Sequence, residues 1–281
     1  MHLQTTSRGR RIRPWPGLLL AVALCGAVAV AAPADERARQ AFGAGQAAPD
    51  GGWTLAQEKV LRQPGTSRER ARLPAGTTLR LATTLQVQEA GRLHEVQLWA
   101  GQRPGGESDG GFGGEVAVLA VFAAGQAAPI DVAEVKTDRF TGFPSAPLLK
   151  LTAADDAFVL HNTHHNAGQP YTAASLFHLR QGRLRRIAEV DLLGELSGCA
   201  KAFDESLEWL TEPDMATLPI VVARVTLVHA PRASTGGCEG RRPAERREVF
   251  EGRWRWDSAK GQYRDQGGTL ERLDRWNDSR R

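Results

Sequence analysis

Short segments in which apolar and polar residues alternate, separated by turns rich in glycine, recur through most of this chain. Between residues 78 and 87, for example, leucine, threonine and valine occupy every second position, which places them on one face of an extended strand. Apolar residues at helical spacing are scarce, and residues 219–229 form the richest β-branched run. The chain is therefore restricted to a body built mainly of β-strands. Further strands are predicted at residues 93–99, 116–122, 130–135, 148–151, 157–161, 175–179, 184–192, 247–256 and 262–264.

Three segments, residues 121–135, 176–190 and 253–264, share a strand–turn–strand pattern. Such hairpins pair antiparallel. The predicted fold class is therefore mainly β, with hairpins assembled into an antiparallel sandwich, a barrel or incomplete propeller-like sheets. One or two short helices are expected as well, at residues 53–63 and 202–211. Residues 270–276 fit either a terminal strand or a helical turn.

The first 34 residues have the composition of a secretory signal peptide. Four arginines and no acidic residue precede an apolar run from Leu18 to Ala32, and Ala32, Pro33 and Ala34 form a small-x-small cleavage pattern. The run is shorter than the roughly 18–20 residues that a membrane-spanning helix needs. We therefore predict a periplasmic or secreted protein, cut near Ala34, with no membrane span after cleavage.

Two other kinds of signal remain open. Cys25 is a possible lipid-attachment residue, although Leu24 precedes it where a small residue is expected. Arg10 and Arg11 form a twin-arginine pair, although Arg13 stands where an apolar residue is usual. Beyond the signal, the composition of residues 35–52, rich in Gly, Ala and Pro, predicts a flexible leader, followed by a single β-dominated domain from 53 to 281.

Removal of the signal changes the charge and the cysteine count. The whole chain has 36 basic and 32 acidic residues, so that loss of four arginines leaves 32 of each. Because phosphate binding needs clustered positive charge, no nucleic-acid partner is expected. Only Cys199 and Cys238 remain, and in an oxidising compartment two cysteines are expected to form one disulfide.

The densest cluster of polar side chains lies at residues 161–171. Its candidate binding residues are His161, Asn162, His164, His165, Asn166 and Tyr171. Imidazole is the commonest protein ligand of zinc and a natural general base. On a strand, however, His161 and His165 would stand about 13 Å apart, and His164 would point to the opposite face. A metal site of these three histidines would need a bend in the chain and a carboxylate from elsewhere, such as Asp155 or Asp156. The other interpretation is a hairpin whose Asn and His side chains form hydrogen bonds with the backbone of their own turn, and it needs neither the bend nor the carboxylate.

Other polar and aromatic groups favour structural roles. Trp254 and Trp256 share one strand face and are predicted to be core rather than a sugar-stacking platform, with Arg253 and Arg255 on the other face. A flexible loop is expected at residues 105–114, because no helix with a phosphate-binding sequence follows it. The last group is predicted to be a solvated face and consists of Asp204, Glu205, Glu208 and Glu212.

No metal, nucleotide or nucleophile motif of the common enzymes is present in the sequence. We therefore expect an exported, non-catalytic binding protein without a cofactor, whose contact surface is the segment 161–171 and whose partner is an envelope protein or a saccharide. One alternative is a metal-dependent hydrolase that uses His161, His164 and His165. A second alternative is a structural component of the cell envelope.

Overall fold

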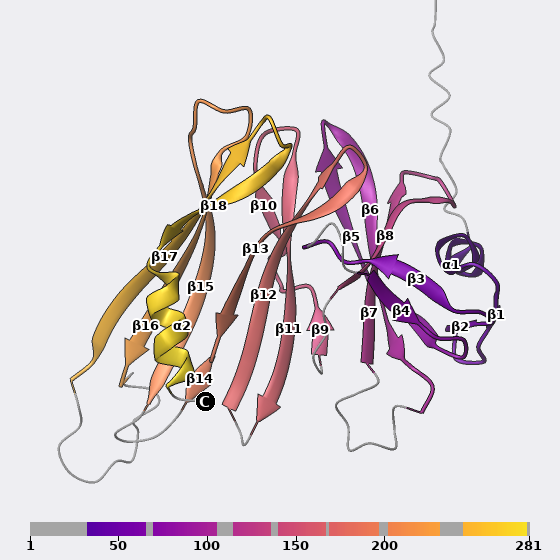
Figure 1. The fold of residues 1–281 in the computed structure, drawn as a ribbon, viewed down its shortest axis with the longest axis horizontal. Coiled ribbons are helices and arrows are strands. Elements are labelled where there is room, and N and C mark those ends of the chain that lie inside the picture. The colour runs from indigo at the N-terminus through magenta and orange to yellow at the C-terminus, as the bar shows by residue number, and fades with distance from the viewer. Residues whose placement is uncertain are drawn as a thin grey trace, which may run out of the picture. The chain divides into compact units, whose positions relative to one another are not determined.

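Three sheets and two helices make up the fold (Figure 1). The computed structural model describes residues 33–65, 70–105, 115–135, 140–166, 169–196, 202–230 and 244–279, except the side chains of residues 166 and 169. All strand pairs are antiparallel apart from a single parallel contact between Arg62 and Ala133. The prediction of a mainly β, antiparallel fold is confirmed, and the arrangement is that of stacked, sandwich-like sheets.

The first sheet has eight strands in the order β1-β2-β5-β6-β7-β8-β3-β4. These strands are β1 (Gly45–Ala47), β2 (Trp53–Leu55), β3 (Lys59–Arg62), β4 (Arg70–Leu73), β5 (Thr78–Glu89), β6 (Arg92–Gln102), β7 (Glu115–Ala123) and β8 (Pro129–Val135). The four longest, β5 to β8, are consecutive in sequence and in space. They form an antiparallel meander, in which each strand pairs with the next one along the chain.

The second sheet has the order β10-β11-β12-β13, and β9 pairs with β11 beside β10. Its strands are β9 (Phe140–Gly142), β10 (Leu148–Lys150), β11 (Asp156–Asn166), β12 (Gln169–Arg180) and β13 (Arg183–Leu192). The third sheet runs β14-β15-β16-β17-β18. Its strands are β14 (Glu195–Leu196), β15 (Phe203–Glu212), β16 (Ile220–His229), β17 (Arg246–Asp257) and β18 (Gln262–Gly268). The helices are α1 (Ala34–Phe42) and α2 (Leu270–Asp278).

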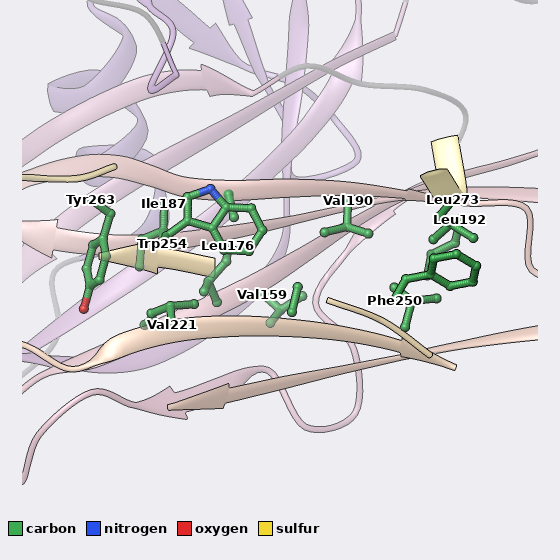
Figure 2. Close-up of a cluster of buried hydrophobic side chains, with 14 of the residues drawn as sticks. Val159, Leu176, Ile187, Val190, Leu192, Val221, Phe250, Trp254, Tyr263 and Leu273 are labelled. Atoms are coloured by element: carbon green, nitrogen blue, oxygen red, sulfur yellow. The ribbon is translucent and has the colours of Figure 1, made fainter. Parts of the chain in front are cut away.

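The second sheet is covered on both faces. Phe158 and Phe177 stack at a centroid distance of 5.7 Å and belong to a core shared with Val96 and Leu119 of the first sheet. Val159 lies next to Phe158 in sequence and therefore points the other way. It joins the core shared with the third sheet, whose residues include Leu176, Val221 and Trp254 (Figure 2). The middle sheet thus supplies buried side chains to two cores.

Residues 35–52 differ from the predicted flexible leader, because they contain α1 and β1. Ala38, Ala41 and Phe42 of α1 are buried on the outer side of the first sheet. The ring of Phe42 meets that of Trp99 edge to face at 5.2 Å. Three apolar residues at i, i+3 and i+4 are a helix signal that the surrounding Gly and Pro concealed.

Two predicted helices are strands, and the ambiguous third segment is a helix. Residues 53–63 contain β2 and β3, and all of residues 202–211 except Ala202 lie in β15, which pairs with β16 from Phe203 to Glu212. Residues 270–276 belong to α2. The two errors have one cause: in short segments, pairing with a neighbouring strand outweighs weak local propensity.

Several predictions fall outside the described residues. They concern the signal segment up to residue 32, Cys25, the predicted bridge between Cys199 and Cys238, and most of the loop 105–114. Within the part of the chain that the structure describes, neither helix has the length and apolar character needed to cross a membrane.

Candidate functional site

The end of the β11–β12 hairpin extends beyond its neighbouring strands. β13 pairs with β12 only as far as Thr172, and β9 pairs with β11 only up to Thr163. The hydroxyls of these two threonines lie 3.0 Å apart across the hairpin. Beyond them, residues 164–166 pair only with residues 169–171 among the described strands. We call these six residues the hairpin tip.

The predicted site residues lie along this hairpin in different environments. His161 is half-buried, and burial lowers its pKa below the ordinary histidine value, which keeps the ring neutral at pH 7. Asn162 accepts a hydrogen bond of 3.2 Å from the Thr141 hydroxyl through its side-chain oxygen. Asn166 pairs through its backbone with Gln169 and closes the described part of the tip.

Four aromatic rings gather at the tip in two pairs. The rings of His164 and Tyr171 stack with centroids 4.9 Å apart and planes 16° apart. The exposed ring of His165 meets Phe140 of β9 edge to face at 6.4 Å. Phe140 is 61% exposed, more than any other Phe, Tyr or Trp of the described chain. Phe140 of β9 therefore presents a flat apolar ring next to the hairpin tip, with the His165 imidazole beside it.

Phe140 was not among the predicted site residues. Residue 140 is 25 positions before His165 in the sequence. The two rings meet only because β9 pairs antiparallel with β11, placing Phe140 opposite Thr163. A strand of three residues has no alternating pattern from which the pairing could have been predicted.

The three histidines do not converge on one point. His164 lies one position from His165 and three from His161, so strand alternation places it on the face opposite to both. In the described residues, no group of three or more His, Cys, Asp or Glu side chains is arranged to hold a metal ion. The alternative of a metal-dependent hydrolase thus has no support from the geometry of these strands.

The tryptophans of β17 are core residues, as predicted. Trp254 is 8% exposed and Trp256 is 6% exposed, and both belong to the core between the second and third sheets. Figure 2 shows Trp254 in this core. On the opposite face of the strand, Arg253 forms an ion pair with Glu212, and Arg255 forms one with Asp214. The indoles are therefore not a sugar-stacking platform.

The acidic residues of β15 divide between two faces. Glu208 is exposed on the outer face, as predicted. For Glu205 the prediction of a solvated position is wrong, because its side chain is buried and accepts a hydrogen bond of 2.8 Å from the Leu193 amide. Glu205 shares its face with Leu207 and Trp209, both of which pack on the core. The prediction was wrong because residues 202–211 were expected to form a helix with these acidic residues on its polar side, whereas side chains alternate between two faces on a strand.

No known protein-family model matches the chain, and no curated protein matches it in sequence.

Proposed function

We propose that this protein is exported and acts by binding a saccharide of the cell envelope at the hairpin tip, without catalysis. The observation that carries the proposal is the exposed Phe140 ring beside His165. A sugar ring has a flat C–H face that stacks on an aromatic ring and hydroxyls at its edge that bond to polar side chains. Phe140 supplies the first kind of contact and the His165 imidazole the second.

Packing of the hairpin supports a preformed binding surface. The rings of His164 and Tyr171 stack on the strand face opposite to His165, and Tyr171 also packs on the core between the second and third sheets. The tip is therefore anchored at its base while the rings of Phe140 and His165 remain accessible. A surface that is ordered before binding loses less conformational entropy when a ligand arrives.

Export is supported by the position of α1. The predicted cleavage point after Ala34 falls at the first residue of α1, whose buried residues begin at Arg37. Arg37 is 4% exposed and forms an ion pair with Glu95. Cleavage there removes the Pro33 carbonyl that accepts the Arg37 amide, but it leaves the buried residues of the helix in the chain.

The test is binding of the mature protein, purified from the exported fraction, to insoluble cell-wall polysaccharide in a co-sedimentation assay. We expect Phe140→Ala to weaken binding about tenfold, because loss of one stacked aromatic contact is worth roughly 1–1.5 kcal/mol. His165→Ala is expected to act in the same direction. Val249→Ala is the matched control, since Val249 is also exposed but lies in β17. Equal binding by all variants would contradict the hairpin tip as the location of the binding site. No binding by the wild type would contradict a saccharide as the ligand.

A further inference from the structure

One edge of the first sheet is open along β5. β6 pairs with β5 over its whole length, whereas β2 on the other side pairs only with Thr78 and Leu79. Among the described residues, no strand continues this pairing toward the end of β5. The side chains next along the strand are exposed: Arg80, Leu81, Ala82, Thr83, Thr84 and Gln86. From residue 80 onward, the outer edge of β5 has no partner among the strands that the structure describes. Figure 1 shows β5 at this edge with β6 beside it.

The turn after β5 determines which backbone groups face outward. Ala90 and Gly91 join β5 to β6 with φ angles of 49° and 74°, as in a two-residue hairpin. In such a hairpin Glu89 bonds across to β6, and the outward N–H and C=O groups belong to alternate residues. The Gln88 amide indeed donates outward to Asp156, at 2.9 Å. By the same alternation, the backbone groups of Gln86 and Thr84 face outward.

The part of the β5 edge that is available for strand pairing has a defined length. At its far end, Asp156 caps Gln88 and Asp155 caps the Ala90 amide, also at 2.9 Å. At its near end, the register of β5 on β6 shifts between Leu81 and Thr83, and such a bulge turns a strand away from flat pairing. The flat stretch between them is residues 83–87, close to the usual length of about five or six residues for a strand.

The open edge of β5 lacks the charges that other edges carry. Charged residues or short edges normally prevent unwanted strand pairing. The exposed edges β4, β13 and β15 follow this rule, with Arg70 and Arg72 in β4, five charged residues in β13 and Glu208 and Glu212 in β15. Residues 81–88 contain no charged side chain. The charges on β4, β13 and β15 disfavour pairing with another strand, whereas the edge of β5 has no such charge and can pair with one.

We propose that the edge of β5 binds the same edge of a second copy of this chain, antiparallel, about a two-fold axis at Leu85. This register places Thr84 opposite Gln86 of the second copy, twice, so that all the outward groups of both residues are bonded. It brings Leu85 opposite Leu85, a favourable apolar pair. Thr83 lies opposite Val87, whose side chain is 1% exposed and already belongs to the core between the first and second sheets. No like charges face each other in this register. Two identical edges without charges therefore pair without electrostatic repulsion.

The first test is the oligomeric state of the mature protein by analytical ultracentrifugation over a range of concentrations. We expect a dimer, and we expect Thr84→Pro to make it monomeric. Proline removes the outward N–H of residue 84 but none of the bonds to β6, so far-ultraviolet circular dichroism should be unchanged. Thr84→Ser keeps the amide and is expected to remain dimeric. A monomeric wild type, or a folded dimeric Thr84→Pro variant, would overturn the proposal.

A cross-linking test reports the register and does not depend on proline. At the two-fold axis the Cα atoms of residue 85 would be a non-hydrogen-bonded pair about 4.5 Å apart, within disulfide reach. Leu85→Cys is expected to give a covalent dimer on mild oxidation. Leu81→Cys, which is exposed but lies off the axis, is expected to give none. Dimer formation by Leu81→Cys but not by Leu85→Cys would contradict the register and with it the proposed contact.

Discussion

A single buried histidine lies where the second and third sheets meet. His178 is 2% exposed and is packed edge-on against Trp256, at 5.8 Å, and Tyr263, at 5.5 Å. Burial lowers the pKa of His178 to about 3, with a smaller contribution from Arg185 and Arg180. Asp155 acts in the opposite direction. The ring is therefore neutral in the folded protein at any pH near neutrality.

This low pKa predicts how stability depends on pH. In the unfolded chain the histidine pKa is 6.5, so that between pH 6.5 and pH 3 the unfolded state takes up a proton that the folded state does not. The free energy of unfolding should fall with decreasing pH, by at most about 1.4 kcal/mol per pH unit from this residue. Urea unfolding at pH 7 and pH 5 measures the fall.

The variant His178→Phe should reduce that dependence, because phenylalanine keeps a ring against its aromatic neighbours and has no proton to gain. The matched control is His165→Phe at an exposed position, which is expected to leave the dependence unchanged. The assignment would be wrong if His178→Phe showed the full wild-type loss of stability between the two pH values.

At the scale of elements, α1 is a part of the fold and not a leader. Its residues Ala38, Ala41 and Phe42 are 1–2% exposed, and the Arg37 guanidinium lies over the Phe122 ring at 4.9 Å. The helix thereby covers the outer core of the first sheet. A helix of nine residues has little stability alone, so this packing is what holds it.

Phe42→Ala should therefore destabilise the mature protein by about 3–5 kcal/mol, the usual range for removing a buried phenylalanine side chain. Gln40→Ala, on the exposed side of the same helix, should change stability by no more than about 0.5 kcal/mol. Chemical denaturation of both variants measures the difference. Equal stability of the two variants would mean that residues 35–42 form a flexible leader after all.

At the scale of the whole molecule, the second sheet couples the other two. Leu176 faces the core shared with the third sheet, whereas Phe158 faces the core shared with the first. Both side chains are fully buried. Truncation of either side chain should therefore also reduce the local stability of sheets that do not contain the altered residue.

We expect Leu176→Ala to cost about 2–5 kcal/mol. Amide hydrogen exchange should become faster in β7 of the first sheet as well as in β16 of the third, because opening of the middle sheet exposes both cores. Leu93→Ala, at a position that is 48% exposed, is the control and should leave both rates near the wild-type values. Faster exchange confined to β16 would show that the sheets open independently.

The strands of this molecule were predictable because their signal is local. In β17, four successive residues alternate between arginine and tryptophan, and this alternation alone places Trp254 and Trp256 on one face and the two arginines on the other. In the proposed binding site, the sequence indicated the hairpin of residues 161–171 and its histidines. Phe140 could not be predicted, because only the pairing of β9 with β11 brings it to His165.

By itself, the sequence determined that the chain is mainly β and which side chains share a strand face, since alternation with a period of two depends only on backbone geometry. The tertiary structure decided which of those faces are covered. Glu205 is buried and Glu208 is exposed because the inner face of β15 meets a core and its outer face does not. It also left the edge of β5 open, because β2 pairs with only two of its residues. Burial and pairing depend on distant segments, whose contact no local pattern encodes.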